Sequence, residues 1–76
     1  MTPYANHSGD SGVRAYAIAA TAIEVQFADG TVYVYNYTIP GRAKVEAMKR
    51  LARSGRGLST YISQQVRGAY ADKRDA

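Results

Sequence analysis

The chain has 76 residues, no cysteine and a formal net charge of +4 at pH 7. This length suits one small domain, and the lack of cysteine excludes disulfides and thiolate metal sites. The N-terminal residues show no secretory signal pattern and no apolar run approaches the roughly 18 residues of a membrane span, so we expect a cytoplasmic protein with no membrane partner.

Charge is distributed unevenly along the chain. Residues 1–41 contain one arginine against three acidic residues, whereas residues 42–71 contain seven lysines and arginines against one glutamate. A basic segment of this kind favours an anionic partner such as nucleic acid or a nucleotide. The plainer interpretation is that helices of soluble proteins carry lysine and arginine for solubility.

Apolar alternation and helical spacing predict one α+β domain over residues 13–71. Residues 1–12 are polar and contain proline and glycine, so we expect a flexible N-terminal tail, and residues 72–76 predict a short C-terminal tail. The expected strands cover residues 13–19, 21–28 and 31–37, and the expected helices run over residues 42–54 and from Ser59 or Thr60 to about Tyr70. The predicted fold is a small three-stranded antiparallel β-meander followed by two helices packed on one face (β-β-β-α-α).

The most informative segment covers residues 23–37, where two alternating runs flank the pair Asp29-Gly30 and predict a β-hairpin. Because side chains alternate along a strand, Tyr33, Tyr35 and Tyr37 lie on one face as a ladder. Whether this ladder faces the core or a ligand depends on the register of the hairpin.

Two registers compete. A two-residue turn pairs Phe27 with Val32 and leaves the tyrosines opposite the core, where they could stack on a ligand. A turn with a bulge at Gly30 pairs Phe27 with Thr31 instead, and the tyrosines of residues 33 and 35 then join the core. The Asp-Gly pair favours the bulged register.

The helix expected over residues 42–54 has two distinct faces. Its core stripe consists of Val45, Met48, Leu51 and Ala52. Another face carries a basic row formed by Arg42, Glu46, Lys49, Arg53 and Arg56. This row is the strongest electrostatic feature of the sequence.

The segment Gly55-Arg56-Gly57-Leu58-Ser59-Thr60 places glycines, an arginine and two hydroxyls where a helix begins. The unpaired N–H groups of a helix start attract phosphate or carboxylate. The architectural interpretation is that Gly55 caps the first helix and that Ser59 or Thr60 caps the second. The spacing does not match a Walker A loop, so nucleotide hydrolysis is not implied.

Residues for catalysis, metal binding or cofactor binding are scarce. The single histidine, His7, lies in the expected tail near Ser8, Asp10 and Ser11, where the fixed geometry of a catalytic triad is not expected. One histidine and scattered carboxylates make a poor metal site. We therefore expect no enzyme activity and no cofactor.

The order of these segments resembles the KTSC domain, which is found at the C-terminus of some lysyl-tRNA synthetases and as a lone bacterial or phage protein. The matching positions are Ser11-Gly12-Val13-Arg14, Ile23-x-Val25-x-Phe27-x-x-Gly30-x-x-Tyr33-x-Tyr35, Ile39-Pro40, Gly57-Leu58-Ser59-Thr60-Tyr61-Ile62, Val66-Arg67 and Tyr70. Ala19-Ala20 stands where this family tends to carry Tyr-Asp, and Ser59 or Ser63 where asparagine is common. The resemblance implies a β-β-β-α-α module and a suspected RNA-binding role.

The sequence as a whole predicts a non-catalytic binding protein for a phosphate-bearing ligand, with RNA slightly favoured. The candidate phosphate-binding residues are Arg42, Lys49, Arg53, Arg56, Gly57, Ser59, Thr60 and Arg67, and the candidate stacking residues are Tyr33, Tyr35 and Tyr61. One alternative is a phage-type homo-oligomer that sequesters a small nucleotide signal between its subunits. Another is a protein-interaction module or phage inhibitor that docks on a host protein.

Overall fold

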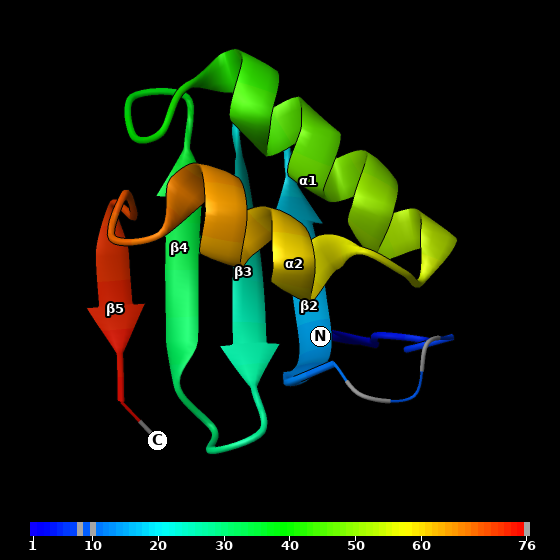
Figure 1. Cartoon of the computed structure of the whole chain (residues 1–76). Coiled ribbons are helices and arrows are strands. Elements are labelled where there is room, and N and C mark those ends of the chain that lie inside the picture. The colour runs from blue at the N-terminus through cyan, green and yellow to red at the C-terminus, as the bar shows by residue number, and fades with distance from the viewer. Residues whose placement is uncertain (8, 10, 76) are drawn as a thin grey trace.

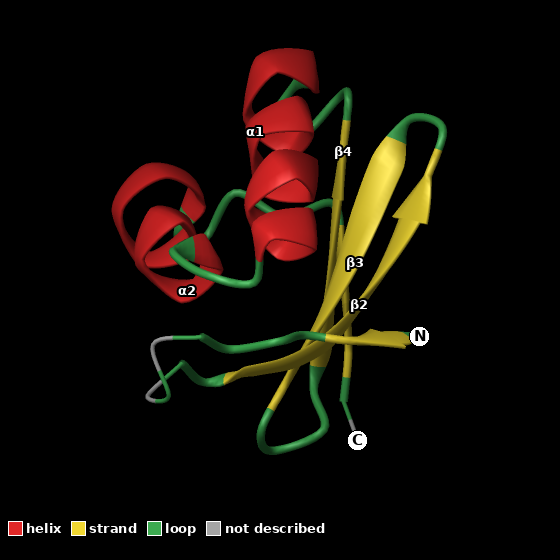
Figure 2. Cartoon of the chain, turned by 90° about the vertical axis from the view of Figure 1, so that its right-hand side faces the viewer, coloured by secondary structure: helices red, strands yellow, loops and turns green. Residues whose placement is uncertain are grey.

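A computed structural model describes residues 1–7, 9 and 11–75, and in this part of the chain an antiparallel sheet carries helices on one face (Figures 1 and 2). Within these residues the strands follow one another across the sheet as β1 (Thr2–Pro3), β2 (Val13–Ala19), β3 (Ala22–Phe27), β4 (Val32–Asn36) and β5 (Asp72–Arg74). The helices are α1 (Arg42–Ser54) and α2 (Leu58–Tyr61), and α2 continues into a turn of π-helix, η1 (Ile62–Val66). None of the helices in the described ranges is long and apolar enough to cross a membrane.

The expectation of a three-stranded meander is wrong, because the described residues form a five-stranded antiparallel sheet. The two further strands come from the segments expected to be tails. β1 pairs with β2, and β5 pairs with β4. Both are short edge strands, where proline and charged side chains are tolerated because an edge strand leaves one row of backbone groups unpaired. The α+β class and the packing of helices on one face agree with the structure.

The N-terminal segment is anchored beyond its strand pairing. Tyr4 is only 6% exposed, and its hydroxyl accepts a hydrogen bond from the Leu58 N–H at 3.3 Å. The His7 N–H donates to the Gly55 carbonyl at 2.8 Å. A Cβ added to Gly55 would lie 2.7 Å from the Cβ of Ala5, so glycine is required for this close approach.

The hairpin adopts the bulged register, which confirms the favoured alternative. Val25 lies opposite Tyr33 and Ile23 lies opposite Tyr35. The Phe27 N–H donates to the Thr31 carbonyl at 2.9 Å. Gly30 has a φ of 90°, a conformation that glycine adopts at little cost. The tyrosine ladder of β4 therefore faces the helices, with Tyr35 in the core at 2% exposure.

Helix α1 has the predicted bounds and packs through its apolar stripe. Val45, Met48 and Ala52 are buried, whereas Leu51 is half-buried at the edge of the stripe. The helix ends at a left-handed Gly55 with φ 77°, and the N–H of this glycine bonds to two carbonyls of the last turn. The prediction of Gly55 as the C-cap is confirmed.

The second helix differs from its prediction at both ends. It begins at Leu58 rather than at Ser59 or Thr60, and its N-cap is Gly57, which makes no side-chain capping bond. Its last residue is Val66, short of the expected end. This early end directs the following residues back toward β4.

Candidate functional site: an aromatic cavity

A cavity of about 350 Å³ opens between the β3–β4 hairpin and the C-terminal end of η1. Its lining residues come from segments far apart in the sequence: Phe27, Asp29, Tyr33, Tyr35, Ile62, Arg67, Gly68 and Tyr70. We call this site the aromatic cavity. Its volume lies at the small end of the range for small-molecule sites, roughly 300–1,000 Å³.

The chain reversal after η1 builds one wall of the cavity. Gly68 has a φ of 78°, a left-handed conformation in which a side chain would be strained. Beyond this turn, the Ala71 N–H donates to the Val34 carbonyl at 2.7 Å, at the start of the pairing with β5. Tyr70 is thereby held against the sheet beside Tyr33, so this wall of the cavity depends on where the second helix ends.

The aromatic rings meet edge to face. The ring centroids of Phe27 and Tyr33 are 5.4 Å apart with an interplanar angle of 90°, and those of Tyr33 and Tyr70 are 4.9 Å apart at 73°. Such contacts are a favoured arrangement of aromatic pairs and restrain ring orientation. The rings of Phe27, Tyr33 and Tyr70 therefore form side walls of the aromatic cavity.

Tyr35 forms the most buried part of the lining. Burial raises the pKa of its phenol to about 12, and the neighbouring phenols of Tyr33 and Tyr70 act in the same direction. At neutral pH Tyr35 is therefore an uncharged hydroxyl at an apolar wall.

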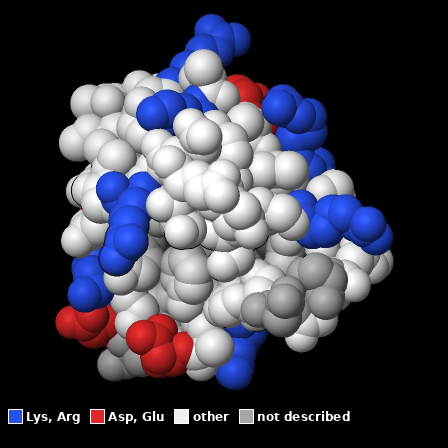
Figure 3. Space-filling model, viewed as in Figure 1, with Lys and Arg blue, Asp and Glu red and all other residues white. Residues whose placement is uncertain are grey.

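Charged groups stand at the margin of the cavity. Arg67 and Asp29 both line it, and both are exposed. The Nζ of Lys73 lies 5.8 Å from the ring centroid of Tyr33 and 3.8 Å from the carboxylate of the exposed Asp75. On the face that carries the helices, lysine and arginine side chains, with acidic side chains among them, surround an uncharged centre (Figure 3).

The carboxylate of Asp29 has a fixed position. Its Oδ1 accepts a hydrogen bond from the Thr31 N–H at 3.0 Å, and bonds from Thr31 lower the pKa of Asp29. None of the ion pairs found among the described residues involves Asp29 or Arg67. The margin thus presents a held carboxylate and a guanidinium that a ligand could engage.

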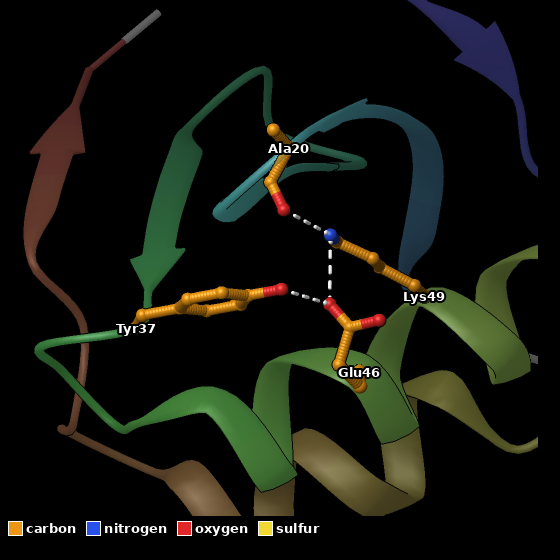
Figure 4. A network of polar contacts seen from close by, with 4 residues as sticks. All are labelled: Ala20, Tyr37, Glu46 and Lys49. Carbon is orange, nitrogen blue, oxygen red and sulfur yellow. Dashed lines mark hydrogen bonds and ion pairs between the residues drawn. The ribbon is translucent and has the colours of Figure 1, made fainter.

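Lys49, a candidate phosphate-binding residue, is placed elsewhere by the structure. It is 5% exposed, and its Nζ lies 2.8 Å from Glu46 Oε2 and donates to the Ala20 carbonyl at 3.1 Å. The hydroxyl of Tyr37 donates to the same glutamate oxygen at 2.8 Å (Figure 4). Lys49 therefore does not belong to an exposed basic row, because it is buried and paired within this α1 polar network of Ala20, Tyr37, Glu46 and Lys49.

The remaining basic candidates on and after α1 are accessible. Arg42, Arg53 and Arg56 are exposed, and the guanidinium of Arg42 lies 5.7 Å from the ring centroid of Tyr37. They belong to α1 and the loop after it (Figure 1), whereas residues of the β3–β4 hairpin and of the end of the second helix line the cavity. The structure does not bring them into the aromatic cavity.

The candidate anion site at the start of the second helix is partly occupied by the protein itself. The first N–H of the helix, on Leu58, already bonds to the hydroxyl of Tyr4. Gly57 and Thr60 are exposed and Ser59 is half-buried. These residues do not line the aromatic cavity, and neither does Tyr61, which packs against the core.

The residues that the structure describes show no arrangement that points to catalysis. His7 is exposed, and Ser8 and Asp10 of the same cluster lie outside the described residues. Within residues 1–7, 9 and 11–75, no group of three or more histidine or acidic residues could hold a metal ion. The expectation of a non-enzyme stays a prediction.

Sequence reasoning identified only part of this cavity. Tyr33, Tyr35 and Arg67 were among the candidates, and the structure places all three in its lining. Asp29 and Tyr70 were interpreted only as a turn residue and a helix residue. An aspartate beside a tyrosine strand was the available signal for Asp29, and Gly68 was the available signal for a chain reversal before Tyr70.

Comparisons with family models, with curated proteins and with solved structures gave no match. The resemblance to the KTSC domain therefore stays a prediction, and the function has to be argued from the site.

Proposed function

We propose that this chain is a non-catalytic binding protein for a phosphate-bearing ligand, with RNA favoured over a free nucleotide. The observation that carries the proposal is the aromatic cavity with Arg67 at its margin. One base would enter between the rings, and the attached phosphate would lie against the guanidinium. Aromatic side chains that receive an unstacked base beside an arginine are typical of single-strand recognition.

The size and the apolar walls of the cavity support a single base as its occupant. A volume of about 350 Å³ is small for a drug-sized ligand but sufficient for one planar ring system with its sugar. Tyr33 and Tyr70 offer ring surface, and Ile62 closes the apolar side toward the second helix. Stacking of a base on an aromatic ring contributes about 1–3 kcal/mol.

Arg67 and Lys73 favour an anionic group over a cationic one on their side of the cavity. The amine of Lys73 already lies near the ring of Tyr33, so a second cation on that ring would be repelled. Arg67 has no ion-pair partner among the described residues and is exposed. A guanidinium of this kind can hold phosphate through two parallel hydrogen bonds.

The exposed Arg53 of α1 and Arg56 of the loop after it support RNA as the first choice. Arg53 and Arg56 lie outside the cavity, where a mononucleotide in the cavity would not need them. A longer strand could contact them with further phosphates. Lys49 is left out of this set because its charge is already paired. The cytoplasm is the compartment we propose for this binding, since RNA and nucleotides are abundant there.

The test is fluorescence anisotropy of a labelled single-stranded RNA of mixed sequence, measured in about 50 mM and about 200 mM salt. Arg67→Glu is expected to weaken binding at least about tenfold, because it removes a phosphate-binding group and adds repulsion. Arg14→Glu is the matched control, since Arg14 is an exposed arginine of β2, outside both the cavity and α1. Equal affinities for the two variants would contradict the assignment of Arg67.

A second variant separates RNA from a free nucleotide. Arg53→Glu combined with Arg56→Glu should weaken RNA binding and lower the salt slope by about 0.7 for each phosphate that the protein no longer neutralises. The same double variant should leave mononucleotide affinity nearly unchanged. If the native protein binds mononucleotides as tightly as RNA, the free nucleotide becomes the better assignment, and binding of neither would overturn the proposed function.

A further inference from the structure

Asp29 is a lining residue that phosphate binding does not explain, because a carboxylate repels phosphate. It stands at the β3–β4 turn on the margin of the aromatic cavity, with Oδ1 bonded to the Thr31 N–H. Each carboxylate oxygen has two acceptor sites, so the carboxylate keeps acceptor sites for a ligand after its bonds from Thr31. Asp29 is exposed and, like any such aspartate, ionised at neutral pH, and bonds from Thr31 lower its pKa further, so it acts purely as an acceptor.

The four bases differ in what they offer to such an acceptor. Guanine carries two adjacent donors on its Watson–Crick edge, the ring N1–H and the exocyclic N2 amine, and these match the two oxygens of one carboxylate. Adenine and cytosine place one amine beside a ring nitrogen that accepts, and uracil places one N–H between two carbonyls. In these three bases an acceptor would face the carboxylate and be repelled by it.

We propose that the aromatic cavity selects guanine and that Asp29 is the residue that determines this specificity. The inference rests on the proposed function, because it names the base that the same cavity takes. The guanidinium of Arg67 would then bind the phosphate, and the carboxylate of Asp29 would bind the edge of the base. A site that is built to pair a substrate's donors rejects analogues that lack them, because its own polar group is left unpaired.

The test compares three purine nucleotides, GMP, IMP and AMP, as competitors of labelled RNA. Inosine keeps the N1–H and lacks the N2 amine, so IMP isolates the second hydrogen bond. We expect GMP to bind most tightly, IMP to be weaker and AMP weakest, with about tenfold to hundredfold between GMP and AMP.

Asp29→Asn is the informative variant. The introduced amide oxygen can still accept from the Thr31 N–H, and Asn-Gly forms hairpin turns as readily as Asp-Gly, so the fold should persist. The variant should lose most of its preference for GMP, while AMP affinity should not fall, because the carboxylate that repels the N1 acceptor of adenine is gone. Asp72→Asn is the control, because it removes the same charge from β5 at an exposed residue outside the cavity.

The outcomes separate the two proposals. Equal affinity of the native protein for GMP, IMP and AMP would overturn the guanine preference and leave the binding function standing. Binding of none of the three, with no RNA binding, would overturn the function itself. An equal loss of GMP and AMP affinity in Asp29→Asn would show that Asp29 supports the site as a whole, which also overturns its role in specificity. The comparison of GMP with IMP in the native protein needs no variant, so it tests the guanine preference even if Asp29→Asn fails to fold.

Discussion

Tyr33 and Tyr37 lie on the same side of the chain near opposite ends of β4, yet their surroundings differ. The hydroxyl of Tyr37 is bonded to Glu46 in the α1 polar network, where the carboxylate is shared with the buried Lys49. Tyr33 lines the aromatic cavity, in contact with the rings of Phe27 and Tyr70. One ladder of tyrosines thus serves a closed network at one end and an open cavity at the other.

The helices that cover each end account for this difference. Helix α1 passes over the end of β4 at Tyr37 and brings its own charged partners, so the polar groups there satisfy one another. At the other end the second helix stops at Val66, and the turn at Gly68 leaves Asp29 and Arg67 at the margin of a space. Closed networks contribute to stability, whereas open polar groups can bind a ligand. Variants at the two ends should therefore change different measurements.

The largest expected effect concerns Tyr35, between the two ends. Its pKa is raised to about 12 in the folded chain, against 10.0 in the unfolded chain. Between these values the unfolded chain loses the phenol proton while the folded chain keeps it, so the free energy of unfolding falls as pH rises from 10 to 12. The full shift corresponds to about 3 kcal/mol. Urea denaturation at pH 9 and at pH 12 measures it.

Tyr35→Phe is the control for this alkaline loss. The variant should lose less stability over the same pH range, because the other titrating groups are unchanged and only this phenol is missing. Identical losses in the native protein and the variant would mean that Tyr35 ionises equally well in both states, and would contradict its burial at an apolar wall.

The next prediction tests the α1 polar network, at the Tyr37 end of β4. Glu46→Ala leaves the ammonium of the buried Lys49 with only the Ala20 carbonyl as a partner, and we expect the free energy of unfolding to fall by about 2 kcal/mol. Glu24→Ala is the matched control, since Glu24 pairs with Arg74 at the surface and such pairs contribute about 0–1 kcal/mol. Chemical denaturation of the variants measures the difference. RNA affinity should stay unchanged in Glu46→Ala, and a loss of affinity there would break the separation between the two ends.

Local patterns predicted the helices and strands that are long enough to show a periodic spacing of apolar residues. The thirteen residues of α1 and the seven of β2 were placed correctly, and the Asp29-Gly30 pair favoured the right hairpin register. β1 and β5, with two and three residues, are too short to show alternation. Their composition, proline in one and three charges in the other, is equally typical of a tail.

The candidate site was predicted less completely, because its parts meet only through tertiary structure. The cavity joins the hairpin to residues 62, 67, 68 and 70, and no local pattern shows that these segments approach one another. The burial of Lys49 could not be predicted for a related reason. Helical spacing gives its direction around α1, but not that the Ala20 carbonyl of the β2–β3 turn would lie 3.1 Å from its Nζ. Contacts between distant segments decided which charges are paired and which remain accessible.

The smallest expected effect is that of Tyr37→Phe, which removes one hydrogen bond and keeps the ring, at a cost of about 1 kcal/mol. The bond from Lys49 and then that from Tyr37 lower the pKa of Glu46. The stability that this carboxylate contributes is therefore present above its unfolded pKa of 4.5 and is lost as pH falls through the lower folded pKa. Without the Tyr37 hydroxyl the folded pKa should move back toward 4.5, which NMR titration of the Glu46 side-chain carboxyl carbon would detect. RNA affinity should not change, whereas Tyr33→Leu should weaken it, because the two tyrosines share a strand face but only Tyr33 borders the cavity.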